Sequence, residues 1–403
     1  MRRRRFLQTV GAGTAGFAAF SCADQEHAER LASSETGISE AGLTWSKAPC
    51  RYCGTGCGVE VGVQDGKVVT VRGDKKSPVN RGLLCVKGYH LPGMLYGEDR
   101  LTHPMLRDGD DWKQISWDEA LDLIASKYQE ALDESGPDSV AIYGSGQWTV
   151  FDGYAASKWF RAGLKSNNVE PNARLCMASA VTGFMTQFQS DEPMGCYEDF
   201  EVGDDFILWG NNMAEMHPVL FSRILANKRE NPGVRIVDIA TRRTPTTDYA
   251  DMYVEFIPGS DLALANGILH LLVKNGKISQ AFLDENVIFK RGIEDIEQIG
   301  FGSWGEDGLG LDPSDGPAEH YRFTDQGRDA SLAELEEFLA DYTPERVSEI
   351  SGVPVGQIRA LAQMYGDQGR GTVSTWCMGV NQHTRGTWMN NLITDLHLIT
   401  GKI

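Results

Sequence analysis

Asp205-Phe-Ile-Leu-Trp-Gly-Asn-Asn212 joins an apolar run of strand length to a polar turn that contains a glycine. Such a run is typical of a strand that is buried on both faces. The pattern recurs in 139–145 and in 234–240, and each run leads into polar residues. Helical patterns separate the runs, one from about His217 and another over 262–274. This alternation predicts an α/β fold with a doubly wound parallel sheet, whose ligands bind beyond the carboxyl ends of the strands.

Further helices are expected along the chain. One covers 153–163, and three amphipathic helices with polar caps cover 331–342, 343–352 and 355–366. Ser260 or Asp261 is expected to cap the helix over 262–274. The Gly/Asp-rich stretch 301–316 is typical of an exposed insertion.

The composition is that of a globular protein with an acidic surface. Of the 403 residues 41% are hydrophobic and 23% are charged, which is ordinary for a soluble domain. The length predicts two to four domains, at about 100–200 residues each. The net charge of −18 repels nucleic acid and anionic lipid and suits a basic protein partner. We therefore expect no nucleic-acid partner.

The first 23 residues differ from the rest. Arg3-Arg-Arg-Phe-Leu7 resembles the twin-arginine export signal, and the apolar stretch 10–20 is too short to span a membrane. We expect a signal peptide over 1–23 and a linker over 24–44. The folded protein would be exported by the Tat machinery after a chaperone has inserted its cofactor. We expect a periplasmic location without stable membrane insertion. The alternatives are a disordered basic tail or a lipoprotein signal with Cys22.

Cys50-Arg-Tyr-Cys53-Gly-Thr-Gly-Cys57 places three thiols within eight residues, and Cys85 follows. Thiols so close cannot all form unstrained disulfides, whereas the glycines let the loop wrap one compact metal site. A triplet with a lone fourth cysteine favours a 4Fe–4S cluster over structural zinc, which usually binds two cysteine pairs. Gly54, not His, follows Cys53, which excludes covalent haem.

The stretch between these cysteines is expected to form β-structure. Apolar residues alternate over 58–72 on both sides of Asp65-Gly66. This pattern predicts a β-hairpin with a type I′ turn. A small β-rich domain over 45–103 therefore carries the cysteines.

Cys85-Val-Lys87-Gly88, after this cysteine spacing, resembles the molybdopterin oxidoreductase superfamily. The resemblance implies that Lys87 lies between the cluster and a pterin. It also implies that Cys176, within Asn172-Ala-Arg-Leu-Cys-Met-Ala-Ser-Ala180, binds molybdenum. A buried structural cysteine is the other interpretation of Cys176, and it is the one we adopt for Cys196 and Cys377.

Three stretches resemble the catalytic subunits of periplasmic-type nitrate reductases, namely 191–198, 208–218 and 378–387. Formate dehydrogenases usually have a proton-accepting His directly after the metal ligand, where this chain has Met177. The resemblance therefore implies reduction of nitrate to nitrite, with electrons from a c-type cytochrome subunit. The alternatives are formate dehydrogenase or another bis-MGD oxidoreductase, an assimilatory nitrate reductase, and a non-catalytic truncated fragment.

By the same resemblance, the cofactor is molybdenum bis(molybdopterin guanine dinucleotide), abbreviated bis-MGD, and Cys176, Met177, Gln382 and Arg385 lie at the catalytic pocket. The expected cofactor contacts lie mostly in loops: Lys87, Gln147, Asn172, Cys176, Trp209, Gly210, Asn211, Asn212, Met213, Ala214, Glu215, Met216, Ala240, Thr241, Arg242, Arg243, Thr244, Gly259, Ser260, Asp261, Met378 and Gln382.

The expected domain order after the cluster domain has three parts. Residues 104–170 begin a molybdopterin oxidoreductase α/β domain, 171–366 form an α/β domain that binds MGD, and 367–403 return to the first of these. Because members of the superfamily run to about double this length, the resemblance implies that the chain is the N-terminal half of such a protein.

Overall fold

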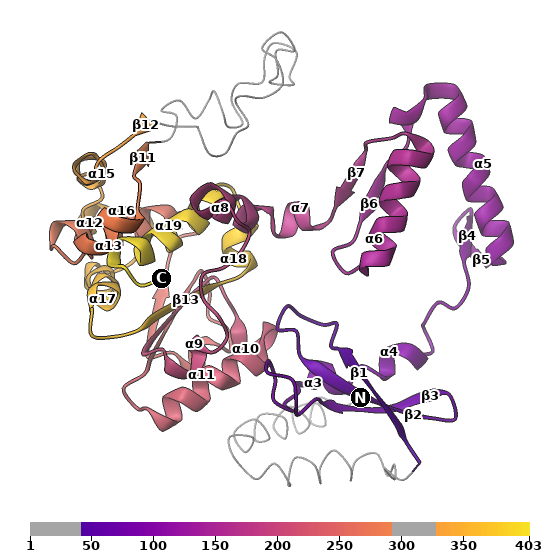
Figure 1. The fold of residues 1–403 in the computed structure, drawn as a ribbon, viewed down its shortest axis with the longest axis horizontal. Coiled ribbons are helices and arrows are strands. Elements are labelled where there is room, and N and C mark those ends of the chain that lie inside the picture. Colours follow the sequence, from indigo (N-terminus) through magenta and orange to yellow (C-terminus); the bar gives the residue numbers. More distant parts are fainter. Residues whose placement is uncertain (1–41, 292–327) are drawn as a thin grey trace. The chain divides into compact units, whose positions relative to one another are not determined.

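The computed structural model describes residues 42–291 and 328–403 (Figure 1). The expected signal peptide, all but the end of the linker and the insertion over 301–316 lie outside the described residues. The chain divides into two compact units, which we describe separately. Unit 1 contains the chain up to Ser126 together with Met216–Glu230, and unit 2 contains Lys127–Glu215 and Asn231–Ile403.

Unit 1 is built on an antiparallel sheet in the order β1-β2-β3, with bounds Thr44–Pro49, Gly58–Gln64 and Lys67–Gly73. Asp65 and Gly66, between β2 and β3, have φ of 49° and 74°. Positive φ at both positions defines the type I′ turn, so the predicted hairpin is confirmed. The other elements of the unit are α3 (Val86–Tyr89), α4 (Gly93–Tyr96), β4 (Met105–Asp108), β5 (Asp111–Gln114), the start of α5 (Trp117–Ser135) and α11 (Pro218–Glu230).

Unit 2 begins with a two-stranded parallel sheet of β6 (Ile142–Gly144) and β7 (Val169–Pro171). The strand expected over 139–145 exists but is shorter, and it is not buried, since Tyr143 is 61% exposed. This partial exposure is consistent with a strand that pairs with a single neighbour among the described strands. The helix expected over 153–163 begins at Val150 as α6 (Val150–Ser157) and continues as the π-helix η2 (Lys158–Leu164). The short turn η1 (Pro137–Ser139) precedes β6.

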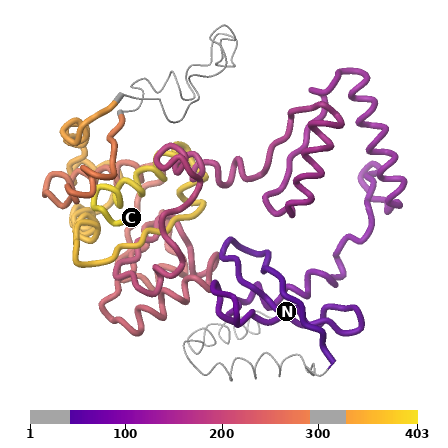
Figure 2. Tube along the Cα trace, in the orientation of Figure 1, coloured from indigo at the N-terminus to yellow at the C-terminus, as the bar shows by residue number. Residues whose placement is uncertain are grey.

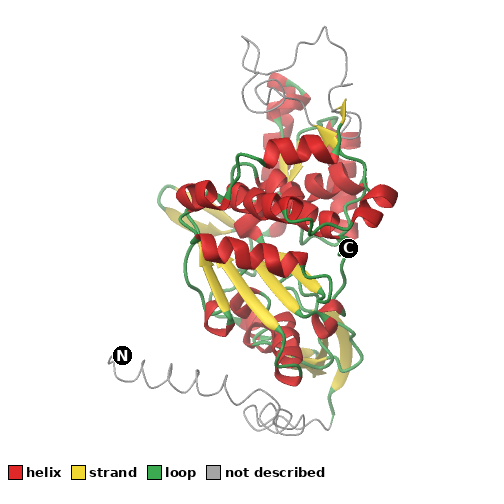
Figure 3. Cartoon of the chain, turned by 90° about the vertical axis from the view of Figure 1, so that its left-hand side faces the viewer, coloured by secondary structure: helices red, strands yellow, loops and turns green. Residues whose placement is uncertain are grey.

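The main sheet of unit 2 has four parallel strands in the order β10-β9-β8-β13. Their bounds are Met252–Glu255, Arg235–Ala240, Asp205–Trp209 and Thr372–Trp376. The chain builds outward from β8 to β10 and then returns to the other side of β8, which makes the sheet doubly wound. Figure 3 shows these strands side by side with helices packed against them. The predicted fold class is confirmed.

One face of the main sheet packs against α12 (Asp261–Lys274), α17 (Val355–Gly366) and α19 (Gly386–Thr400). Ile207 of β8 and Ile239 of β9 are fully buried in this core. On the opposite face, Phe206 meets Phe200 of α9 (Asp199–Val202), with ring centroids 6.2 Å apart. Helices on both faces explain why these strands are apolar throughout.

The remaining elements of unit 2 are short. They are α7 (Ala173–Cys176), α8 (Ala178–Phe188), η3 (Thr247–Tyr249), α13 (Gln280–Asn286), α15 (Leu332–Leu339), α16 (Pro344–Ser351) and α18 (Met378–Asn381). The helix α10 (Met213–Met216) lies at the boundary of the two units. Figure 2 shows β11 (Lys290–Arg291) and β12 (Arg328–Asp329) side by side where the described chain stops and resumes, and the two strands pair antiparallel.

The caps agree only partly with expectation. Ser331 forms a capping box with Glu334 at the start of α15, and Thr343 caps α16, as predicted. Pro354 precedes α17 without a side-chain cap. Ser260 does not cap α12, because its hydroxyl donates to the carbonyl oxygen of Ile257 at 2.6 Å.

The expected return of 367–403 to the domain begun at residue 104 stays a prediction. Within unit 2, β13 pairs with β8 along its whole length, from Thr372–Asp205 to Trp376–Trp209. The stretch therefore completes the main sheet. Within the described residues no helix is both long and apolar enough to cross a bilayer.

Asp205, at the start of β8, is an ion-pair centre with a fully buried side chain. Arg235 donates to both of its carboxylate oxygens at 2.7 Å, and Arg370 donates at 2.8 Å. Burial alone would raise the pKa of Asp205, but the hydrogen bonds from the two arginines outweigh burial and hold this pKa below its usual range.

Asp205→Asn should lower the free energy of unfolding by about 3 kcal/mol at neutral pH, since it leaves two guanidinium groups facing a neutral amide. The depressed pKa makes the stabilisation complete above the unfolded-state pKa of about 3.9, and it is lost as pH falls through the folded-state pKa. Urea unfolding of both proteins at pH 7 and pH 3 measures this. An equal difference at both pH values would contradict it.

Candidate functional site

The four clustered cysteines are brought together by the small sheet of unit 1. Cys50, Cys53 and Cys57 lie in the loop between β1 and β2, where the Cys50 amide donates to the Cys57 carbonyl oxygen at 2.8 Å. Cys85 is the N-cap residue of α3. All four thiols are free. One loop and one helix start therefore supply four sulfurs.

Asn80 joins the two cysteine-bearing segments, which sequence analysis did not predict. Its side-chain oxygen accepts from the Gly58 amide at 2.8 Å, and its amide group donates to the Gly58 and Leu83 carbonyl oxygens at 2.9 and 2.7 Å. Gly58 follows Cys57, and Leu83 precedes Cys85 by two residues. Asn80 is 1% exposed. It lies in a turn outside any motif, so only its three contacts identify it.

The electrostatics of these cysteines fit a metal cluster. Burial raises the pKa of Cys57 to about 12, and the neighbouring Cys50, Cys53 and Cys85 add to this rise. Burial also raises the pKa of Cys50. Four thiolates so close need bound cations to replace their protons, and iron supplies these. In the described part of the chain, no three His, Cys, Asp or Glu residues are arranged around a single ion.

Asn80→Ala should reduce cluster loading. The loss of three buried hydrogen bonds costs about 2–4 kcal/mol and frees the two segments from each other. Iron and acid-labile sulfide per chain measure the effect. Asn168→Ala is the control, because the Asn168 amide group donates to the Val140 and Asp138 carbonyl oxygens within unit 2, whereas the cluster cysteines belong to unit 1. Equal iron content in both variants would contradict the role of Asn80.

Lys87 lies on α3, two residues after Cys85. Its Nζ donates to the Met216 carbonyl oxygen at 3.2 Å. Burial lowers the pKa of His217, and the charge of Lys87 lowers it further. The cation therefore stands between the cysteine cluster and the α10–α11 turn within unit 1.

The predicted cofactor loops of unit 2 meet at the carboxyl end of the main sheet. Gly210 follows β8 with φ of 53°, and Gly379 follows β13. A Cβ on Gly379 would lie 2.5 Å from the Gly210 carbonyl oxygen. The sheet changes its winding direction between β8 and β13. This switch point is where doubly wound sheets bind their ligands.

Polar atoms beside the switch point fit a nucleotide. Asn211 donates to Thr375 Oγ1 at 3.1 Å, but its own side-chain oxygen is buried without a partner. Thr244 Oγ1, in the loop after β9, is likewise buried without a partner. Buried polar atoms normally find a partner, so these two are suited to hydrogen bonds from a bound dinucleotide.

Several of the predicted cofactor contacts also make hydrogen bonds or pack within the fold. The side chain of Trp209 points into the core and donates to Tyr365 Oη at 3.0 Å, and Met213 is 2% exposed. Asn212 accepts a hydrogen bond from Thr246 at 2.8 Å, and Ala214 donates its amide to the same hydroxyl at 3.0 Å. These contacts hold the loop in its shape from within.

The stretch after β9 and the start of α12 are also at this end of the sheet. Ala240 is the last residue of β9 and is 9% exposed, whereas Thr241 and Arg242 are exposed. The Arg243 guanidinium lies 4.7 Å from the Tyr253 ring centroid. Gly259 has φ of 85°, which suits a turn before α12. Glu215, in α10, is exposed and accepts a hydrogen bond from the Asn212 side chain.

Cys176 lies beside a segment far along the chain. Its Sγ is 3.4 Å from the Sδ of Met378, which follows β13. Ser179 donates to the Asn381 carbonyl oxygen at 2.8 Å, and the Asn381 amide lies 3.8 Å from the Sδ of Met177. The fold thus joins the predicted metal ligand to 378–382. Asn381 was not predicted, and only its contacts across the chain identify it.

The other predicted residues lie around these two segments. Asn172 accepts a hydrogen bond from the Gly146 amide, which places it beside the loop of Gln147. Gln382 is exposed and follows α18. Arg385 has φ of 67°, and its guanidinium lies 5.6 Å from the Trp388 ring centroid.

Asp261 pairs with a histidine that sequence analysis did not single out for the pocket. Asp261 Oδ2 lies 3.0 Å from His383 Nε2, and Asp261 is 4% exposed. Because the Thr384 carbonyl oxygen 2.8 Å from Nδ1 only accepts, Nδ1 carries a hydrogen. The start of α12 is therefore tied to the loop of Gln382.

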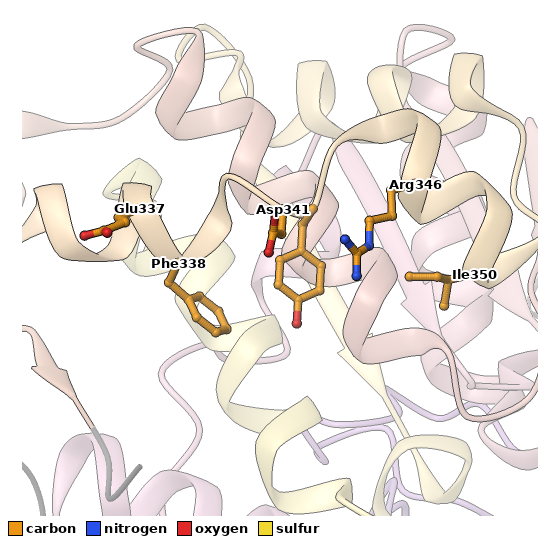
Figure 4. A pocket seen from close by; sticks show the side chains of 6 residues that line it. Glu337, Phe338, Asp341, Arg346 and Ile350 are labelled. Carbon is orange, nitrogen blue, oxygen red and sulfur yellow. The ribbon is translucent and has the colours of Figure 1, made fainter.

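A pocket of about 350 Å³ lies elsewhere, between α15 and α16 (Figure 4). Its lining residues are Glu337, Phe338, Asp341, Tyr342, Arg346 and Ile350. None of them is a predicted site residue. This pocket is separate from the switch point.

Comparisons with known proteins agree with this geometry. Residues 43–97 match the model of the molybdopterin oxidoreductase Fe4S4 domain. A similar solved structure is acetylene hydratase from Pelobacter acetylenicus, with a TM-score of 0.64 and 20% identity over 89% of this chain and 43% of that one. The chain therefore spans less than half the length of that protein, and at this identity the likeness shows the fold.

The cofactors follow from these matches and from the donor sets. The Fe4S4 match assigns the four cysteines of unit 1 to a cluster domain and removes the zinc interpretation. The thiol of Cys176 and the unpartnered atoms of Asn211 and Thr244 fit a molybdenum ion carried by a pterin dinucleotide. Residues 100–403, three quarters of the chain, match the molybdopterin oxidoreductase family model, so the chain belongs to this family, whose cofactors are molybdopterin-bound molybdenum and a 4Fe–4S cluster.

Proposed function

We propose that the protein reduces nitrate to nitrite as the catalytic subunit, or its N-terminal half, of a periplasmic nitrate reductase. The observation that carries the proposal is Met177, directly after Cys176. Its thioether lies 3.8 Å from the Asn381 amide. A thioether cannot take up a proton at neutral pH, whereas formate oxidation needs a proton acceptor near the metal. Oxygen transfer from nitrate needs no base at this position.

The bound cofactor would supply the two electrons that convert nitrate and two protons into nitrite and water. Cys176 would hold the metal and tune its potential. The Arg385 cation, which is exposed above the Trp388 ring, would attract the nitrate anion towards the pocket. Gln382, exposed in the same segment, would donate amide hydrogens to a nitrate oxygen.

Electrons would enter through the 4Fe–4S cluster. Lys87, two residues from Cys85, places a positive charge beside the cluster and would stabilise its reduced form. We propose a c-type cytochrome subunit as the donor. The net charge of −18 suits a basic partner of this kind. Tat export and a periplasmic location belong to the same proposal and rest on Arg3-Arg-Arg-Phe-Leu7.

The test is an assay of the protein purified with its cofactors. With reduced viologen dye as donor, nitrate should be consumed and nitrite formed in equal amounts. With oxidised dye as acceptor, formate should give no turnover. Turnover of formate alone would replace the proposal with formate dehydrogenase. Turnover of neither substrate, with molybdenum bound, would reject both.

A further inference from the structure

The chain contains two Cys-Met dipeptides, Cys176-Met177 and Cys377-Met378. The function proposed above uses only the first cysteine, and the second was interpreted as structural. Cys176 ends α7 and Cys377 directly follows β13, and the fold brings the two dipeptides together, since the Cys176 Sγ contacts the Met378 Sδ. This convergence places thiol and thioether groups side by side at the carboxyl end of the sheet.

We use the name sulfur cluster for the sulfur atoms of Cys176, Cys377 and Met378. The Sγ of Cys176 and the Sδ of Met378 are 3.4 Å apart, although the residues are 202 positions apart in the chain. Cys377 is covalently adjacent to Met378 and directly follows β13. Burial raises the pKa of its thiol, and the Cys176 thiol raises this pKa further. All three side chains are half-buried, so a small ion can reach them.

We propose that, in the molybdenum-free protein, this sulfur cluster binds one Cu(I) ion. Thiolate and thioether ligands favour soft metal ions, and Cu(I) is among the ions that they select. Two sulfurs bound to one ion at roughly 2.3 Å in a trigonal arrangement lie about 4 Å apart, so the observed 3.4 Å requires only a small side-chain adjustment.

The same ligand set disfavours other metals. Zinc prefers nitrogen, thiolate and carboxylate ligands, and it usually takes four. Across residues 42–291 and 328–403, no three His, Cys, Asp or Glu side chains are grouped to hold an ion. The cluster offers two thiols, and its third ligand is a thioether. Binding of Cu(I) releases the two thiol protons and changes no oxidation state.

The proposal is independent of the substrate, since it concerns the protein before molybdenum arrives. Cu(I) would occupy the Cys176 thiolate that the molybdenum cofactor needs. Copper-loaded protein would therefore resist cofactor insertion until a stronger Cu(I) ligand removes the ion.

The experiment uses the full chain with its 4Fe–4S cluster in place and without molybdenum, under anaerobic conditions. One equivalent of Cu(I) is offered from its complex with a chromogenic chelator. We expect transfer of one ion per chain with no iron released. Bound copper should also slow alkylation of Cys176 and Cys377 by iodoacetamide, which peptide mass spectrometry measures residue by residue.

Cys377→Ser and Met378→Leu should each weaken Cu(I) binding about tenfold or more, the low end for a disturbed metal site. Cys196→Ser and Met185→Leu are the matched controls on exposed positions and should bind copper as the parent does. Circular dichroism checks that each variant is folded. Unchanged binding in both test variants, or iron release in proportion to the copper bound, would overturn the proposal.

Discussion

Cys176→Ala is expected to abolish turnover while the EPR signal of the reduced 4Fe–4S cluster remains. Cys176 is the thiol at the carboxyl end of the main sheet that is suited to bind molybdenum, and its Sγ lies 3.4 Å from Met378 Sδ. Alanine removes the sulfur and leaves no ligand at that point. Disturbing even the partners of metal ligands costs about 10–100-fold, so loss of the ligand itself should exceed this range. Viologen-coupled nitrate reduction and EPR on the same sample measure both parts.

Cys196→Ala is the matched control for this substitution. Cys196 is exposed, and its amide donates to Asp199 at 2.7 Å through the backbone, which alanine preserves. This variant should retain parental turnover and the same molybdenum content. Turnover in Cys176→Ala within tenfold of the parent would refute the assignment of Cys176. Loss of the cluster signal in that variant would show a folding defect instead.

Gly379→Ala should give a large loss of stability, because it disrupts the switch point of the sheet. The added Cβ would lie 2.5 Å from the oxygen and 2.8 Å from the Cα of Gly210. Both obstacles are backbone atoms at the end of a buried strand, so neither can rotate away. Overpacking of this kind costs about 3 kcal/mol. It should also separate the two loops that the dinucleotide needs, and so lower molybdenum content.

Gly356→Ala is the control for that substitution. Gly356 is in α17, where a Cβ would meet nothing within 4 Å. Alanine there should raise the free energy of unfolding by about 0.5 kcal/mol through its better helix propensity. Denaturant unfolding compares the two variants with the parent. A Gly379→Ala protein as stable as Gly356→Ala would contradict the close approach of Gly210 and Gly379.

Local patterns predicted much of the fold. The apolar runs at 205–209 and 234–240 became the central strands, because a run buried on both faces needs apolar side chains throughout. Asp65-Gly66 predicted its turn because few residues tolerate positive φ. Local patterns did not predict features that depend on tertiary packing. Tyr143 in the strand at 142–144 is exposed, and the Ser260 hydroxyl donates to Ile257 and does not cap the helix.

Some features of the candidate site could likewise be predicted from the sequence, and others could not. The cysteines at 50, 53 and 57 were readable because eight residues of chain hold them together whatever the rest of the protein does. Trp209 was expected to contact the cofactor, and this stays a prediction, but the sequence did not show that its side chain hydrogen-bonds Tyr365 in the core. The residues next to Trp209 in the sequence do not reveal which way its side chain points, because its hydrogen-bond partner Tyr365 lies on α17.

The sequence by itself determined the cluster cysteines, the hairpin and the parallel strands, because each depends on residues close together in the chain. Only the tertiary structure decided that Asn80 ties the cysteine segments together and that Cys176 meets Cys377-Met378. The contact of Cys176 with Met378 depends on the pairing of β13 with β8, although more than 160 residues separate these two strands in the chain. Chain connectivity constrains local geometry strongly, whereas distant pairs are selected by the packing of the whole sheet and its helices.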